Sequence, residues 1–148
     1  MEIKGVTINS GDLVFVPLGG SNEIGMNMNL YHFAGKWLIV DLGISFGDDT
    51  MPGVDVLVPD PSFIEQRREN LLGIVITHGH EDHIGGIPHL WERLRCPIFA
   101  TPFAASLIRR KLIEKRIADD VKLIEVHPSK SFALGPFKLE LISLTHSI

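Results

Sequence analysis

Four residues of the types that bind divalent metals stand within six positions of the chain. They belong to His78-Gly79-His80-Glu81-Asp82-His83, which has the pattern H-x-H-x-D-H. In extended backbone, side chains two positions apart point the same way, so His78 and His80 can share one ion. Once the chain turns towards a helix, Asp82 and His83 face elsewhere and suit a second ion. Imidazole nitrogens and carboxylate oxygens at about 2.0–2.2 Å are ordinary zinc ligands.

A polar loop of solvated histidines is the alternative interpretation. It would be preferred for an isolated histidine, and His32, His89 and His127 are expected to be structural or exposed because they lack ligand-spaced partners. For four donors that follow an apolar strand, a metal site is the better explanation. Gly79 is expected to remove a side chain where the backbone bends tightly.

The histidine motif must be positioned by the elements on either side of it. Residues 72–77 are rich in β-branched side chains and are typical of a central strand. Residues 84–94 fit a helix whose first turn is made irregular by two glycines and a proline. The other expected strands are residues 13–18, 28–33 and 36–40 (the last two a hairpin around Ala34-Gly35), 96–100, 121–126 and a half-buried strand with alternating Phe137, Leu139 and Leu141.

Two cap-plus-proline signals predict further helices. Asp60-Pro61 should open a helix that runs to about Asn70, and Thr101-Pro102 one that runs to about Ile117. Residues 44–59 are expected to form a long surface loop. Strands that alternate with helices indicate a mixed α/β architecture, and the early hairpin indicates a mixed rather than a purely parallel sheet. The buried face of the second helix is expected to carry Ala104, Leu107, Ile108 and Leu112.

The H-x-H-x-D-H motif after an apolar strand, with Asp41-x-Gly43 upstream, resembles the metallo-β-lactamase superfamily. Residues 18–27 (LGGSNEIGMN) and 41–46 (DLGISF) resemble, more narrowly, the ribonuclease J family of bacterial RNA-processing nucleases in the β-CASP branch. The likeness runs from Leu13 to Ile148. It implies the αββα sandwich of the superfamily, here mainly its N-terminal ββα half.

The resemblance also implies a ligand set. His78, His80 and His146 would hold one zinc ion, and Asp82 and His83, the expected catalytic pair, would help to hold a second. Asp41 would position the histidine loop by hydrogen bonding.

The family's bridging aspartate and last histidine would lie beyond Ile148, as would the β-CASP domain and the C-terminal region. Residues 1–148 are therefore expected to be part of a metallo-β-lactamase domain that binds one zinc ion well and is inactive alone.

The expected activity of the intact parent is metal-dependent hydrolysis of RNA phosphodiesters, with a hydroxide between two metals as the nucleophile. Two alternatives stay open: another hydrolase of the superfamily that acts on esters or thioesters, and a non-catalytic, truncated folding unit. No RNA-binding residues are assigned. The net charge of −4 favours a solvated helix face over an RNA-contact surface for the basic cluster of Arg109, Arg110, Lys111, Lys115 and Arg116.

Length and composition limit the number of domains, the cellular compartment and the kinds of partner that we expect. With 148 residues, 45% of them hydrophobic, the chain suits one compact domain. Its single cysteine, Cys96, excludes an internal disulfide, fits a reducing compartment and is expected to be a small buried hydrophobe. Apolar runs fall short of the roughly 20 residues of a membrane span. We expect a cytoplasmic location, RNA as partner and no membrane contact. We also expect a homo-oligomeric parent, and a chain that self-associates through an uncovered apolar face.

Overall fold

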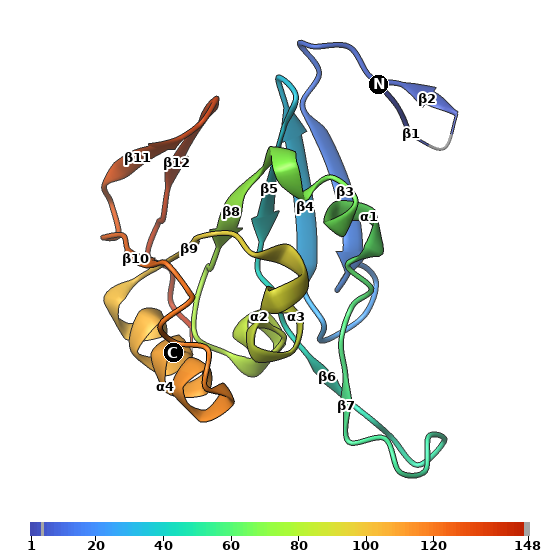
Figure 1. Cartoon of the computed structure of the whole chain (residues 1–148), viewed down its shortest axis with the longest axis vertical. Coiled ribbons are helices and arrows are strands. Elements are labelled where there is room, and N and C mark those ends of the chain that lie inside the picture. The colour runs from blue at the N-terminus through green and yellow to red at the C-terminus, as the bar shows by residue number, and fades with distance from the viewer. Residues whose placement is uncertain (4, 147–148) are drawn as a thin grey trace.

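A six-stranded mixed sheet forms the centre of the computed structural model, which describes residues 1–3 and 5–146 (Figure 1). The strand order is β10-β9-β8-β5-β4-β3. The first three pairings in that order are parallel and the last two antiparallel, so the expected mixed sheet is confirmed. The strands are β3 Val14–Gly19, β4 Met28–Phe33, β5 Lys36–Val40, β8 Leu71–Val75, β9 Ile98–Ala100 and β10 Leu123–Glu125.

Helices cover one face of this sheet (Figure 1). The larger hydrophobic core lies between them and the sheet, and Leu30, Ile74 and Ile98 on the strands meet Ile87 and Ile108 on the helices with no exposed surface. Burial of apolar side chains of this size is the main force that holds the two layers together. The helices are α1 Ser62–Glu65, the 3-10 turn η1 Arg68–Asn70, α2 Glu81–Ile84, α3 Ile87–Leu94 and α4 Pro102–Lys115.

A hairpin packs on the opposite face of the sheet. It consists of β11 Ser131–Leu134 and β12 Phe137–Glu140, and the ring of Phe132 stacks on Phe99 with 5.9 Å between centroids. A smaller core forms there around Leu38 and Val75. Helices on one face and strands on the other match the expected ββα half of the fold. The remaining strands form two small antiparallel pairs: β1 Glu2–Ile3 with β2 Val6–Thr7, and β6 Ser45–Phe46 with β7 Val56–Leu57.

The hairpin β4–β5 and the helix α4 agree closely with the sequence. The two strands have the expected bounds, and positive φ values at Ala34 and Gly35 close the turn between them. At the start of α4, the Oγ1 of Thr101 accepts the N–H of Ala104 at 3.4 Å, as the capping signal predicted. Of the four residues expected on its inner face, Ala104, Ile108 and Leu112 are buried and Leu107 is partly buried.

Two expectations about residues 44–70 are wrong. The surface loop contains the hairpin β6–β7, and the helix after Asp60-Pro61 ends at Glu65 rather than near Asn70. The side chain of Arg67 gives the reason for the early end. Its guanidinium donates to the carbonyl oxygen of Phe63 at 2.7 Å and lies 4.1 Å above the ring of that residue. The backbone N–H of Arg67 donates to the carbonyl of Ile64 instead, so the side chain of Arg67 takes the place of the helical hydrogen bond to Phe63.

The helix expected over residues 84–94 is divided into α2 and α3. The N–H of Gly86 donates to the carbonyl of Leu42 at 2.9 Å, which joins the break between the helices to the segment after β5. The irregular first turn predicted from the two glycines is therefore a full interruption. As shown below, this break brings the histidine motif against the end of β5.

Other expectations concern single side chains. Cys96 is buried, and burial raises the pKa of its thiol to about 12, as expected for an unreactive small hydrophobe. His89 and His127 are exposed.

Within the described part of the chain, no helix is both long and apolar enough to cross a membrane. Self-association stays a prediction; the large apolar side chains at the surface include Leu13, Phe15, Ile24, Phe46, Phe103, Ile142 and Leu144.

His32 on β4 should make stability sensitive to acid. It is 5% exposed, its Nδ1 has no hydrogen-bond partner, and its ring lies 4.7 Å from that of Trp37. Burial, with a smaller effect of the N-terminal ammonium group, lowers its pKa below 6.5. The unfolded chain therefore takes up the proton first, and stability contributed by neutral His32 is lost as the pH falls through about 6.5 and below.

The substitution His32→Leu tests this assignment. Urea unfolding between about pH 7.5 and pH 5.5 should show a smaller loss of unfolding free energy in the variant than in the wild type. His89→Gln, which removes an exposed histidine, should keep the pH dependence of the wild type. Parallel curves for the wild type and His32→Leu would contradict the assignment.

Candidate metal centre

The site lies at the edge of the sheet where β5 and β8 end. These strands are parallel neighbours, so the residues that follow them emerge side by side. Asp41 follows β5 with φ 64°, and its N–H donates to the carbonyl of Val75 on β8 at 2.9 Å. Thr77 and His78 follow β8. The carboxyl ends of strands are where α/β proteins place their binding sites, because the loops there converge.

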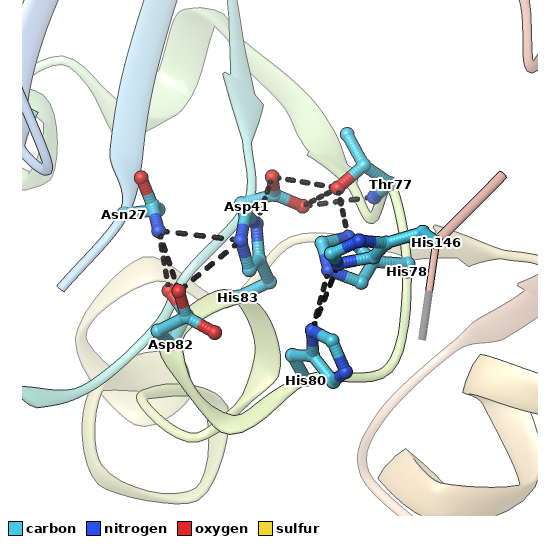
Figure 2. A network of polar contacts seen from close by, with 8 residues as sticks. All are labelled: Asn27, Asp41, Thr77, His78, His80, Asp82, His83 and His146. Carbon is cyan, nitrogen blue, oxygen red and sulfur yellow. Dashed lines mark hydrogen bonds and ion pairs between the residues drawn. The ribbon is translucent and has the colours of Figure 1, made fainter. Parts of the chain in front are cut away.

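Three imidazole rings converge beyond this edge. The Nε2 of His78 lies 3.0 Å from the Nδ1 of His80, and the Nε2 of His146 lies 3.1 Å from the same atom. All three ligand atoms lie within 4.8 Å of one another (Figure 2). His146 arrives from the chain after β12, 66 residues away from His80 in sequence. The structure thus brings together the three histidines that the resemblance grouped.

The donor set fits a divalent cation. A neutral imidazole nitrogen that accepts has a single in-plane lone pair, and one that donates has a single hydrogen. The Nδ1 of His80 therefore cannot form good hydrogen bonds with two ring nitrogens at once, whereas three lone pairs can converge on one ion. With the metal–nitrogen bonds usual for zinc, tetrahedral angles place ligand nitrogens about 3.3 Å apart. The two short separations are close to this value.

Asp82 and His83 form a second, smaller group of donors. The Oδ2 of Asp82 lies 3.4 Å from the Nε2 of His83. The amide of Asn27 faces both atoms, at 3.4 Å and 3.3 Å, and donates to the carbonyl of Asp82 at 3.0 Å. Within residues 1–3 and 5–146, the only cluster of three or more metal-ligand side chains is His78, His80 and His146. Asp82 and His83 thus stand beside this cluster as two further donors.

The carboxylate of Asp41 connects the two groups. It is 3% exposed and accepts the backbone N–H of Thr77 at 2.8 Å. Its Oδ2 lies 2.8 Å from the hydroxyl of Thr77 and 2.7 Å from the Nδ1 of His83. Asp41 thus contacts the histidine loop as expected. Such contacts fix the ring orientation of ligands in metal sites.

The environment shifts the pKa values of two histidines in opposite directions. Burial lowers the pKa of His78, and the nearby His83 lowers it further. Burial also acts to lower the pKa of His83, but the hydrogen bond to Asp41 and the charges of Asp41 and Asp82 outweigh it and raise the value. The lowered pKa of His78 favours the neutral ring, the form in which imidazole binds metals.

Two glycines allow the backbone to pack closely around the motif. A Cβ on Gly43 would lie 1.6 Å from the carbonyl oxygen of Asp82, so only glycine fits there. Next to it, the N–H of Leu42 donates to the carbonyl of His83 at 2.8 Å. A Cβ on Gly79 would lie 2.7 Å from the side chain of Leu107 on α4. The absence of a side chain at Gly79 therefore lets the loop pack closely against α4.

Sequence reasoning missed three contributors to the site. Asn27 is the last residue of the quoted segment 18–27 and Thr77 directly precedes the histidine motif, but the sequence assigned neither a role in the site. Lys111 was placed in a solvated basic cluster, yet its ammonium group forms an ion pair with Glu81 inside the histidine motif. In the same cluster, Arg109 lies 3.5 Å from Glu125. The available signal for Thr77 was its position directly before H-x-H, and for Asn27 its place in the quoted segment 18–27; no sequence pattern indicated the contact between Lys111 and Glu81.

Comparison with known proteins identifies the family. A model of the metallo-β-lactamase superfamily matches residues 25–116, which include β4, β5, β8 and the histidine motif. The chain belongs to the metallo-β-lactamase superfamily. Membership implies a divalent metal, in agreement with the converging histidines.

Curated relatives of this superfamily member are named ribonuclease J. The protein from Sinorhizobium meliloti is 38% identical over 141 residues, covering 93% of this chain and 25% of its own. That from Mycobacterium tuberculosis strain H37Rv is 39% identical, covering 95% and 25%. The one from Synechocystis sp. is 41% identical over 138 residues, covering 92% and 22%. The chain therefore spans about a quarter of the length of these relatives.

Solved structures support the metallo-β-lactamase fold. The metallo-β-lactamase fold protein YhfI from Bacillus subtilis superimposes with a TM-score of 0.61 at 20% identity, over 90% of this chain and 53% of its own. Zn²⁺-bound PqqB from Methylobacterium extorquens gives a TM-score of 0.52 at 18% identity, over 74% and 36%. The fold class expected from the sequence is thus confirmed.

The Asp41 contacts lead to a stability prediction. Asp41→Asn keeps the shape of the buried side chain but replaces one acceptor oxygen by a donor, which then faces the donors of Thr77 and His83. We expect a loss of about 1–3 kcal/mol in the free energy of unfolding, measured by urea denaturation. Asp119→Asn, on the exposed surface, should change it by less than about 0.5 kcal/mol. Equal effects of the two substitutions would contradict the structural role of Asp41.

Proposed function

We propose that this chain provides the metal-binding part of a metal-dependent ribonuclease, which hydrolyses RNA phosphodiesters. The convergence of His78, His80 and His146 on one point carries the proposal, because it creates a site for a Lewis acid at an open edge of the sheet. The similarity to proteins named ribonuclease J, at 38–41% identity, supports RNA as the substrate class. The unpaired Cys96 fits a reducing compartment, and we propose the cytoplasm.

The residues divide into ligands and supports. We propose the Nε2 of His78, the Nδ1 of His80 and the Nε2 of His146 as ligands of one zinc ion, with Asp82 and His83 contributing to a second site. A bound zinc ion lowers the pKa of its water and polarises a phosphoryl oxygen. Asp41 holds the loop that carries these ligands, and Asn27 orients Asp82 through its carbonyl and carboxylate.

Under this proposal, residues 1–148 supply only part of the second metal site. Asp82 and His83 supply two donors, whereas a metal site needs three or four protein ligands. We therefore propose that residues 1–148 alone hold one zinc ion tightly and are nearly inactive, and that further residues of a longer protein complete the site. The relatives, about four times as long as the matched segment, are consistent with this division.

A substrate panel tests the proposed function. The 148-residue chain and a version extended to the length of the relatives should be assayed with zinc against RNA, single-stranded DNA, a β-lactam and a thioester. We expect RNA cleavage by the extended protein only, and a loss of about 100-fold or more in His80→Ala, which removes a metal ligand. His89→Ala, an exposed histidine outside the site, should retain activity. Thioester or β-lactam hydrolysis without RNA cleavage would favour another hydrolase of the superfamily.

A further inference from the structure

The hydroxyl of Thr77 lies between the carboxylate of Asp41 and the ring of His78. Its Oγ1 is 2.8 Å from the Oδ2 of Asp41 and 3.0 Å from the Nδ1 of His78 (Figure 2). The nitrogen on the far side of that ring, Nε2, is the one that faces His80 at 3.0 Å. A short chain of contacts thus runs from a buried carboxylate to a proposed metal ligand.

The direction of the hydrogen bonds in this chain follows from the chemistry of its members. An ionised carboxylate only accepts, and Asp41 also accepts the backbone N–H of Thr77. The single hydroxyl proton of Thr77 therefore points at Asp41, which leaves only oxygen lone pairs towards His78. The Nδ1 of His78 must then carry the ring hydrogen, and its Nε2 is a bare lone pair.

We propose that Thr77 is a positioning residue that fixes the tautomer of His78, so that the Nε2 lone pair is always directed at the metal. This inference rests on the metal site of the proposed function. Without the hydroxyl, the neutral ring is free to carry its hydrogen on Nε2, which blocks that atom as a ligand. The hydrogen bond of the second ring nitrogen is the usual device for setting the tautomer of a metal-binding histidine.

The same carboxylate acts directly on the second group of donors. The Oδ2 of Asp41 accepts the Nδ1–H of His83 at 2.7 Å, so in the neutral ring the Nε2 of His83, which faces Asp82, carries no hydrogen. Asp41 therefore reaches both groups, His83 directly and His78 through the hydroxyl of Thr77. Removing the hydroxyl of Thr77 takes one hydrogen bond from Asp41 but leaves its contacts with the backbone N–H of Thr77 and with His83, so the effect should fall mainly on His78.

The substitution Thr77→Val removes the hydroxyl with little other change. Thr77 is exposed, so valine leaves no cavity in the core, and the backbone N–H that donates to Asp41 is retained. Thr77→Ser keeps the hydroxyl and provides the rescue. Thr7→Val, in the exposed strand β2, controls for the loss of a threonine hydroxyl elsewhere.

Two measurements on the 148-residue chain test the inference. Competition with a chromophoric chelator should show zinc affinity about 10–100-fold weaker in Thr77→Val and unchanged in Thr77→Ser and Thr7→Val. In the metal-free protein, at a pH where the ring is neutral, ¹⁵N NMR should place the hydrogen of His78 on Nδ1 in the wild type and in Thr77→Ser. In Thr77→Val a substantial fraction of it should move to Nε2.

The outcomes separate this inference from the proposed function. Wild-type zinc affinity in Thr77→Val, or a wild-type His78 that carries its hydrogen on Nε2, would overturn the role of Thr77. If the wild type binds no zinc, the proposed metal site fails. The tautomer measured in the metal-free protein still decides, independently, whether the hydroxyl of Thr77 directs the ring hydrogen.

Discussion

The hydrogen bonds accepted by one buried carboxylate hold the candidate metal centre in place. Asp41 is 3% exposed, and a charge so far from water is tolerated only when hydrogen bonds replace its hydration. Thr77 and His83 provide them, at 2.7–2.8 Å. Because β5 and β8 are parallel neighbours, Asp41 meets this loop at the end of both strands. The strand order of the sheet thereby determines where the histidines stand.

Close backbone packing confines the histidine loop on its other sides. The segment after β5 bonds to the carbonyls of Glu81 and His83, and Gly43 approaches Asp82 more closely than any residue with a Cβ could. On the side of α4, Gly79 packs against Leu107 and Lys111 pairs with Glu81. A site whose ligands are already ordered binds its ion more tightly, because no binding free energy is spent on ordering them. Here the sheet and α4 hold the histidine loop, so its ordering takes place on folding rather than on metal binding.

The sequence predicted the features that depend on near neighbours in the chain. The i, i+2 spacing grouped His78 with His80, the turn at Ala34-Gly35 gave the bounds of β4 and β5, and the cap at Thr101 gave the start of α4. Sequence patterns did not predict the features that depend on contacts between residues far apart in the chain. Asn27 contacts Asp82 across 55 positions, a pair that no spacing in the sequence indicates. The helix after Asp60 ends at Glu65, where the side chain of Arg67 replaces a backbone hydrogen bond to Phe63, and the sequence pattern does not indicate that contact. The grouping of His146 came from family resemblance, not from spacing.

Anomalous diffraction at the zinc edge tests the central claim most directly. Crystals of the 148-residue chain grown with excess zinc salt should show one strong peak about 2.0–2.1 Å from the Nε2 of His78, the Nδ1 of His80 and the Nε2 of His146. A much weaker peak, or none, is expected between Asp82 and His83. No density among the three rings, or zinc bound only through Asp82 and His83, would contradict the account.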